Sequence, residues 1–481
     1  MSEILPAFFC GERRLASAGL TLDSINPATG EVIARFPRCG KSDVDAAVTA
    51  AVQAFPPWRS LHPEERAAQL LALADRVESD RERLLRLDVR DNGSPIREMA
   101  LDLDIGTKHL RYFAGIVLQL RGETIETGYD RLNYTLRQPF GVVAQIIPFN
   151  HPLMFALKTI GAPLAAGNTV IVKPSEHTSL SAIALAEHIE KVFPPGVLSI
   201  VTGTGDEAGD ALVTHPDVRR IHFIGGEATG RTIQARAAGM GVKSITLELG
   251  GKNPIVIWPD ADVDTAIDAV VSGMRFNFQG QACGSTSRLL LQRAHRRAFV
   301  DRLAEKLDRL RSGMPEDEST EVGAIVNEAQ MNKVLHYIEV GRREGGTVCV
   351  GGERLRRGEF AAGYFVRPTL FTDLPAASRL LQDEIFGPVL ATVDYDDYSD
   401  AIRIANSVRY GLTASLYTRD LRIAHRFARD VEAGYVWVND NQRHFLGAPY
   451  GGNKASGLGR EEDPSELASY TETKNVNLRF A

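Results

Sequence analysis

A cysteine and a glutamate in two separate glycine-containing segments are the residues of this chain best suited to covalent chemistry. Cys283 ends the uncharged segment FQGQAC, and Glu248 lies 35 residues earlier in LELGGK. A thiolate is a strong nucleophile and a carboxylate can act as a base, so a fold that joins the two segments would create a nucleophile and its base. A lone cysteine is more often a small buried hydrophobic residue, and the hypothesis therefore depends on further signals.

The composition is that of an ordinary globular protein with more than one domain. The chain has 481 residues, of which 44% are hydrophobic and 24% are charged. A prior of roughly 150 residues per domain predicts two or three domains. The net charge is −6 and no long run of lysine or arginine occurs, so we expect no nucleic-acid partner.

The cysteines and the N-terminal residues favour a cytoplasmic location. Cys10, Cys39, Cys283 and Cys349 are far apart and form no C-x-x-C pair, so we expect neither a metal site nor a disulfide framework. A reducing compartment fits this pattern. The first residues lack the basic and apolar regions of a signal peptide. No run of about 18 uncharged apolar residues occurs, so we expect no membrane partner.

An alternation of strands and helices after Gly141 predicts a parallel, doubly wound sheet. Residues 41–120 before it read mainly as helices, with apolar residues at helical spacing over 43–55 and 64–89. Short β-branched runs then alternate with helix-length segments, and sheets of this kind bind nucleotides at the carboxyl ends of their strands. The predicted strands are 142–147, 169–172, 197–201 and 220–224, and the predicted helices between them include 179–192 and 206–214.

A second α/β pattern follows Gly251 and predicts a second domain with its own sheet. Its predicted strands are 254–258, 287–291 and 348–350, and its predicted helices are 263–275 and 296–311.

Two further segments, 122–139 and 470–480, alternate as exposed strands do. An exposed strand needs a partner edge, and a lone hairpin is marginally stable in water. We therefore expect a homodimer or a homotetramer in which the C-terminal tail adds to a sheet of another subunit.

Eight short segments, in the same order along the chain, give it a resemblance to the NAD(P)-dependent aldehyde dehydrogenase superfamily. The resemblance extends from about Asn26 to the C-terminus. The segments are NPATGE (26–31), PFN (148–150), KPSE (173–176), FIGG (223–226), LELGGK (247–252), GQAC (280–283), EIFGPV (384–389) and PYGGNKASG (449–457).

The resemblance implies an α/β, aldehyde-dehydrogenase-like fold with two doubly wound domains and a small β-hairpin that takes part in oligomerisation. Residues 1–120 and 140–250 would form the NAD-binding domain, and 251–445 the catalytic domain. Residues 121–139 and 446–481 would be bridging and oligomerisation segments.

The same resemblance implies oxidation of an aldehyde to the carboxylic acid with reduction of NAD+. Cys283 would attack the carbonyl carbon to give a thiohemiacetal, because a thiolate is the strongest nucleophile that a side chain offers. The side chain of Asn150 and the backbone N–H of Cys283 would stabilise the oxyanion. Glu248 would activate the water that hydrolyses the resulting thioester.

By resemblance the cofactor is NAD, with NADP less favoured. Lys173 would meet a ribose hydroxyl or a phosphate. Glu176 would accept hydrogen bonds from the adenine-ribose hydroxyls and repel a 2′-phosphate. The remaining expected cofactor residues are Ile147, Pro148 and Phe149, Ser175, Gly225 and Gly226 near the pyrophosphate, and Glu384 and Phe386 at the nicotinamide ribose.

Several departures from the family pattern concern the cofactor and the substrate. Phe149 replaces a common Trp, Gly226 replaces a common Ser, and Thr159 stands where many relatives carry a Lys proposed to relay protons. His151 aligns with an aromatic pocket residue. Lys158 aligns with a position that is Trp in many relatives and Arg in the salicylaldehyde and vanillin dehydrogenase branch. A cation there would suit an aromatic or anionic aldehyde, and the alternative is a lysine turned to solvent.

Two other functions remain to be weighed. A CoA-acylating semialdehyde dehydrogenase would resolve the thioester with CoA, but such enzymes generally lack the glutamate found here as Glu248. An inactive structural or binding homologue would keep the fold alone, and the intact set of Cys283, Asn150, Glu248 and Glu384 argues against it.

Overall fold

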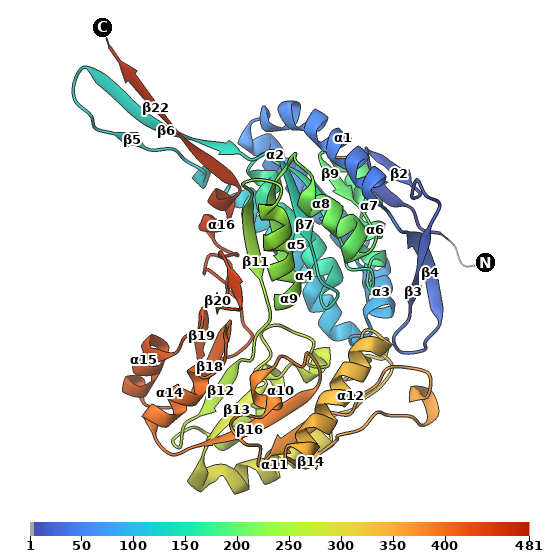
Figure 1. The fold of residues 1–481 in the computed structure, drawn as a ribbon, viewed down its shortest axis with the longest axis vertical. Helices are drawn as coiled ribbons and strands as arrows, with labels where there is room; N and C mark the ends of the chain where they lie inside the picture. The colour runs from blue at the N-terminus through green and yellow to red at the C-terminus, as the bar shows by residue number, and fades with distance from the viewer. Residues whose placement is uncertain (1–3, 481) are drawn as a thin grey trace.

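The strands predicted between residues 142 and 224 lie in an eight-stranded sheet (Figure 1). The structure is a computed structural model that describes residues 4–480. The five central strands run parallel, as the sequence predicts. In order across the sheet, the strands are β2 (Glu12–Arg14), β1 (Ala7–Phe9), β9 (Leu198–Ile200), β8 (Thr169–Lys173), β7 (Val142–Ile146), β10 (Val218–Ile224), β11 (Ser244–Glu248) and β21 (Gly457–Leu458).

Helices cover both faces of this sheet. They are α1 (Lys41–Arg59), α2 (Pro63–Ser79), α3 (Arg81–Asn92), α4 (Ile96–Gly115), α5 (Pro152–Ala165), α6 (Leu180–Ala184), α7 (Ala186–Val192), α8 (Asp210–Thr214) and α9 (Glu227–Ala238). Successive residues of β7 point to opposite faces: Val143 packs with α2, α4 and α5, whereas Val142 and Ala144 pack with α1 and α8. The predicted doubly wound arrangement is confirmed. The helix predicted over 64–89 is two helices, because Asp80 leaves the helical conformation (φ −111°, ψ 19°).

The second α/β unit, in the lower half of Figure 1, is built on a seven-stranded sheet that is parallel except for its first strand. The order is β14 (Thr347–Val350), β15 (Thr369–Thr372), β16 (Val389–Tyr395), β13 (Arg288–Gln292), β12 (Pro254–Ile257), β18 (Thr413–Tyr417) and β19 (Tyr435–Val438). Its helices are α10 (Val263–Gly273), α11 (Arg296–Asp308), α12 (Glu328–Arg343), α13 (Arg379–Gln382), α14 (Tyr398–Asn406) and α15 (Leu421–Asp430). In β12, Ile255 packs against α10 and α11, and Val256 packs against α14 and α15. The prediction of a second sheet is confirmed.

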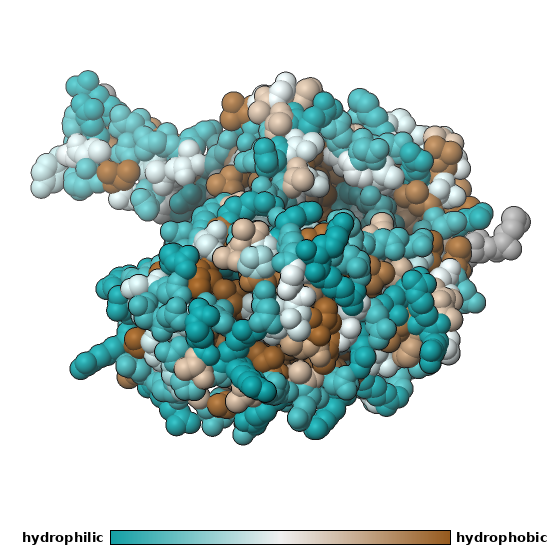
Figure 2. All heavy atoms as spheres, turned by 60° about the horizontal axis from the view of Figure 1, so that its bottom comes forward, coloured by the Kyte–Doolittle hydropathy of each residue, from teal (hydrophilic) through white to brown (hydrophobic). Residues whose placement is uncertain are grey.

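A three-stranded arm projects from the first unit (Figures 1 and 2). It contains β22 (Thr471–Arg479), β6 (Arg131–Pro139) and β5 (Thr124–Ile125), in that order. β22 pairs with β6 over its whole length, from Thr471 opposite Pro139 to Arg479 opposite Arg131. One edge of β22 is thus paired with β6 of its own chain, and its other edge has no partner among residues 4–480. The expectation that the tail adds to a sheet of another subunit stays a prediction.

The segment before the arm belongs to both units. β20 (Asn453–Lys454) pairs with β17 (Tyr410–Gly411), and β21 pairs with β11 in the first sheet. A short helix, α16 (Pro464–Ser469), then leads to β22. Residues 446–481, assigned from the sequence to bridging, thus also complete the first sheet. Near the N-terminus, β3 (Thr21–Ile25) and β4 (Val32–Pro37) form a separate hairpin. Within residues 4–480 no helix is long and apolar enough to cross a membrane.

Candidate active site

The loop that carries Cys283 is held by backbone turns and by the amide side chains of Asn253 and Gln442. A short 3-10 helix, η3 (Phe276–Phe278), lies between Arg275 (φ 58°) and Gln279 (φ 54°), two non-glycine residues in the left-handed region. Asn253 Nδ2 donates hydrogen bonds to the carbonyl oxygens of Cys283 (2.7 Å) and Ser285 (3.0 Å). Strained backbone of this kind persists where the surroundings enforce it, often at functional sites.

Glu248 ends β11, and the glycines after it allow a close approach by Glu384. A Cβ atom at Gly250 would lie 2.0 Å from a carboxylate oxygen of Glu384. The N–H of Gly251 donates to Glu384 Oε1 at 3.0 Å. Because Gly250 has no Cβ atom, the carboxylate of Glu384 can occupy this space. Glu384, from the second unit, therefore lies against the backbone that follows β11.

Asn150 lies between β7 and α5, in a turn held by Asn92. Asn92 Nδ2 donates to the carbonyl oxygens of Phe149 (2.7 Å) and Asn150 (3.3 Å). Asn150 is 4% exposed, and its Oδ1 has no hydrogen-bond partner among residues 4–480. A buried amide oxygen without a donor is unusual in proteins. This oxygen is an acceptor, so an oxyanion would have to meet the N–H₂ group of the same side chain.

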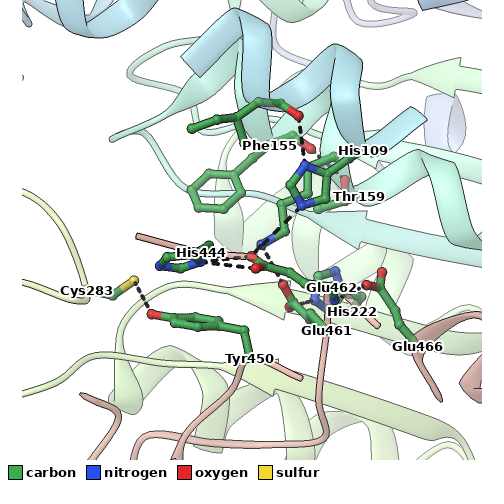
Figure 3. Close-up of polar contacts among 12 residues, drawn as sticks. His109, Phe155, Thr159, His222, Cys283, His444, Tyr450, Glu461, Glu462 and Glu466 are labelled. Atoms are coloured by element: carbon green, nitrogen blue, oxygen red, sulfur yellow. Dashed lines mark hydrogen bonds and ion pairs between the residues drawn. The ribbon is translucent and has the colours of Figure 1, made fainter. Parts of the chain in front are cut away.

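A cavity of about 390 Å³ contains Cys283 and Glu248 in its wall. Tyr450 Oη lies 3.9 Å from Cys283 Sγ (Figure 3). This volume is in the range of small-molecule sites. The wall consists of Asp102, Ile105, Lys108, His109, His151, Met154, Phe155, Lys158, Glu248, Arg275, Ala282, Cys283, Gly284, Gln442, His444, Phe445, Leu446, Tyr450 and Glu462.

Burial favours the protonated form of both reacting groups. Burial, with a smaller contribution from the charge of Glu248, raises the pKa of Cys283 to about 12. Burial, followed by the charge of Glu461, raises the pKa of Glu248 well above its usual value. Carboxyl and thiol groups in low-dielectric surroundings favour the uncharged form.

Lys158 lines the cavity but is already paired with two carboxylates. Its Nζ donates to Glu462 Oε1 at 2.6 Å and lies 3.1 Å from Glu461 Oε2. Burial alone would lower the pKa of Lys158, but the charges of Glu462 and Glu461 outweigh burial and raise it well above its usual value. At 5% exposure Lys158 does not face solvent. The argument that it offers a free cation to an anionic aldehyde fails, because its charge is balanced within the protein.

Two neighbouring sequence predictions can be placed as well. His151 lines the cavity, as expected, and its Nδ1 donates to Asp102 Oδ2 at 2.6 Å. Its ring lies 4.6 Å from that of Phe278. Thr159 is buried and donates to the carbonyl of Phe155 at 2.8 Å, so its hydroxyl is satisfied within its own helix.

The predicted cofactor residues gather at one edge of the first sheet. β8, β7 and β10 are adjacent and parallel, so their carboxyl ends bring together residues 147–149, 173–176 and 225–226. A Cβ atom at Gly225 would lie 2.4 Å from the ring of Phe223, whereas Gly226 faces open space at the start of α9. A helix N-terminus with a free approach suits an anionic phosphate.

The two ends of this edge differ in chemistry. Lys173 is 2% exposed, and its Nζ donates to Glu176 Oε2 at 3.1 Å. Ser175 accepts a hydrogen bond from the N–H of His177. Phe386, which has φ 58°, comes from the second unit, and its ring meets the edge of Phe149 at 5.6 Å. Charged and hydroxyl side chains lie at one end, where they could bind a ribose or a phosphate, and aromatic rings lie at the other. This arrangement fits a dinucleotide.

Comparison with known proteins agrees with this geometry. A family model described as the aldehyde dehydrogenase family matches residues 15–476. Aldehyde dehydrogenase tropH of Talaromyces stipitatus is 41% identical over 480 residues, which cover 98% of this chain and 93% of that protein. Aldehyde dehydrogenase [NAD(P)+] 2 of Saccharomyces cerevisiae is 39% identical, with 99% and 96% covered. The NAD+ complex of an aldehyde dehydrogenase from Bacillus cereus is 40% identical, with a TM-score of 0.97 and coverage of 100% and 97%.

The fold and the cavity are those of an oxidoreductase with two α/β units. This chain belongs to the aldehyde dehydrogenase family, and the prediction that it is an enzyme of that class is confirmed.

Sequence reasoning did not single out three residues that shape the site. Asn92 and Asn253 hold the Asn150 turn and the Cys283 loop through backbone carbonyls, and no local motif reveals such contacts. Tyr450 lies in PYGGNKASG, but only the fold places its hydroxyl beside the thiol.

The raised pKa of Cys283 predicts slow alkylation of this thiol in the free protein at neutral pH. Because the thiolate is the reactive form, we expect the rate of iodoacetamide labelling to rise about tenfold per pH unit across the accessible alkaline range. Peptide mass spectrometry would measure the rate, with the exposed Cys349 labelled in parallel. A plateau below about pH 9, near the ordinary cysteine pKa of about 8.5, would contradict the effect of burial.

Proposed function

We propose that this protein oxidises an aldehyde to the carboxylic acid with NAD+, through a covalent intermediate on Cys283. The observation that carries this proposal is the presence of a thiol and a carboxylic acid, Cys283 and Glu248, in the wall of one cavity. Bound NAD+ would supply the hydride acceptor. Lys173, Glu176, Gly225, Gly226 and Glu384 would hold it, with the other residues of the sheet edge.

The chain's own groups would perform four tasks. Cys283, once deprotonated, attacks the carbonyl carbon. The amide N–H₂ of Asn150 and the backbone N–H of Cys283 donate to the oxyanion, and such donors are worth about 3–4 kcal/mol each in the transition state. Transfer of the aldehyde hydrogen as hydride to bound NAD+ would leave a thioester on Cys283. Glu248, in its ionised form, would then remove a proton from the water that attacks this thioester. The C–S bond breaks, the carboxylic acid is released, and the Cys283 thiolate takes back a proton from Glu248.

The charge of Glu176 supports a preference for NAD over NADP. Burial would raise the pKa of Glu176, but the charge of Lys173 outweighs burial and lowers it. Glu176 is therefore an anion at neutral pH, and it would repel a 2′-phosphate. One relative is named for both cofactors, so the preference is one of degree.

The arm supports a homodimer or a homotetramer. β5 has an unpaired edge in the three-stranded sheet, and Ile125, Leu136 and Leu478 of the arm are exposed. An uncovered edge with apolar side chains is a site for association. A monomer mass by light scattering at micromolar concentration would contradict this assignment.

A cytoplasmic location is proposed from the free cysteines.

An aldehyde panel tests the proposed function. We expect NADH formation that does not require CoA, because Glu248 is in place to activate water. Cys283→Ala should lose more than about 99% of kcat, whereas the exposed Cys349→Ala should keep wild-type activity. Turnover by Cys283→Ala, or turnover only with CoA, would contradict the mechanism.

Glu248→Gln should separate the two halves of the reaction. Removal of a general base typically costs 10²–10⁴-fold, and only thioester hydrolysis needs this base. Stopped-flow absorbance should therefore show a burst of NADH followed by turnover about 100-fold slower than wild type. An unchanged steady-state rate would show that another group activates the water.

Cofactor selectivity tests Glu176. kcat/KM should favour NAD over NADP by at least about tenfold, or roughly 1.4 kcal/mol, and Glu176→Gln should narrow the ratio. Equal use of both cofactors by the wild-type enzyme is the result that contradicts charge repulsion.

A further inference from the structure

The hydroxyl group of Tyr450 lies directly beside the reactive thiol, in the wall of the cavity. Its Oη is 3.9 Å from Cys283 Sγ (Figure 3), and this is the only hydrogen bond that the hydroxyl makes to residues 4–480. Tyr450 is 3% exposed. A buried hydroxyl group costs free energy unless it has a partner, and the sulfur atom is the partner that the fold supplies.

Contacts on both the ring and the backbone of Tyr450 fix the direction of this hydroxyl. The ring packs on His444 with centroids 4.3 Å apart and on Tyr435 with centroids 5.6 Å apart. The backbone N–H of Tyr450 donates to the carbonyl of Glu461 at 2.9 Å, and the N–H of Glu461 donates back at 2.8 Å. A side chain held in this way keeps its polar end aimed at one atom.

The surroundings of Cys283 disfavour the thiolate form that a nucleophile needs. Burial raises the pKa of Cys283 to about 12, and the charges of Glu248 and Glu384 act in the same direction. Two groups act against them, the hydrogen bond with Tyr450 and, to a smaller extent, the charge of Lys158. Because Lys158 is already paired with two carboxylates, the Tyr450 hydroxyl is the group best placed to stabilise the thiolate.

The direction of the hydrogen bond follows from the chemistry of the two groups. Burial, followed by the charges of Cys283 and Glu248, raises the pKa of Tyr450 well above its usual value, so the phenol keeps its proton. A thiolate has no proton and can only accept. The contact of 3.9 Å is long, but hydrogen bonds to charged acceptors are short, and catalytic contacts that are long in a free enzyme commonly tighten during the reaction.

We propose that Tyr450 is a catalytic residue whose hydroxyl donates a hydrogen bond to the Cys283 thiolate and so increases the fraction of the thiol that is ready to attack. The same bond stabilises Sγ again when the C–S bond of the thioester breaks. The hydroxyl keeps its proton throughout, and no covalent bond to Tyr450 forms. The role in turnover rests on the proposed function, whereas the effect on the thiol exists without substrate or cofactor.

Alkylation of Cys283 in the free protein tests this hydrogen bond without any aldehyde. Tyr450→Phe removes the hydroxyl and keeps the ring. We expect iodoacetamide to label Cys283 about tenfold more slowly in this variant at each pH, because a hydrogen bond to a charged group changes the thiolate population by about that factor. The substitution removes an atom beside the thiol, so blocked access cannot explain a lower rate.

Two further proteins and an internal standard complete the labelling experiment. Tyr435→Phe removes a hydroxyl from the same aromatic cluster but outside the cavity wall, and it should label at the wild-type rate. With 3-fluorotyrosine at position 450, which is a stronger donor of nearly the same shape, Cys283 should label faster than in the wild type. The exposed Cys349 should react equally in all of them.

Equal labelling of Tyr450→Phe and wild type would overturn the inference. So would faster labelling of Tyr450→Phe, which would show that the hydroxyl accepts from the S–H group and holds the thiol protonated.

Turnover tests the catalytic part of the inference. For an aldehyde that the wild-type enzyme oxidises, kcat/KM of Tyr450→Phe should also fall about tenfold, since the attack of the thiolate precedes hydride transfer. An unchanged kcat/KM would overturn the catalytic role even if labelling is slower. Failure of the wild-type protein to oxidise any aldehyde would instead refute the proposed function and leave the labelling result as it stands.

Discussion

A hydrogen bond from the loop that joins the two α/β units to a carboxylate of the second unit is the contact on which the site depends. Gly251 donates to Glu384, and the absent side chain of Gly250 makes room for it. The same stretch carries Glu248, and a Cβ atom at Gly251 would lie 2.9 Å from the carbonyl oxygen of Cys283. The two glycines therefore allow the thiol loop, the base and Glu384 to lie close together. A side chain at position 251 would press on the backbone of Cys283, and one at position 250 would displace the Glu384 carboxylate.

The buried charges around Lys158 lie next to groups of opposite charge. The cluster around Lys158 holds two glutamates and a doubly hydrogen-bonded histidine, His222, and removal of one member would leave an uncompensated buried charge, which typically costs about 3–5 kcal/mol. Such a network defines the shape and polarity of the cavity wall more strictly than apolar packing would. The polarity of that wall therefore depends on all members of the cluster together, and a change to one of them alters it.

Local patterns predicted the two sheets, most helices and the Cys283 and Glu248 segments, because strand alternation and glycine-rich turns depend on neighbouring residues. The Asn150 segment and the cofactor segments were predicted from the resemblance to the family. The pairing of β22 with β6 could not be predicted, since it joins segments more than 300 residues apart and an unpaired strand pattern fits either subunit. The position of Lys158 in the cavity follows from the fully buried helix α5. The pairing of Lys158 with Glu461 and Glu462 could not be predicted in the same way. These two glutamates come from a loop that is distant in sequence, and no local pattern indicates its conformation at Glu462.

The route of residues 446–479 has a consequence for biosynthesis. This single stretch contributes Tyr450 and Glu462 to the cavity wall, β21 to the first sheet and β22 to the arm. It leaves the ribosome after both α/β units, which can begin folding as they emerge. In a nascent chain, the carboxyl ends of the first sheet can therefore form early. The cavity around Cys283 stays open until this stretch docks, because Tyr450 and Glu462 are missing from its wall. Closure of the reactive centre therefore depends on the docking of this one stretch.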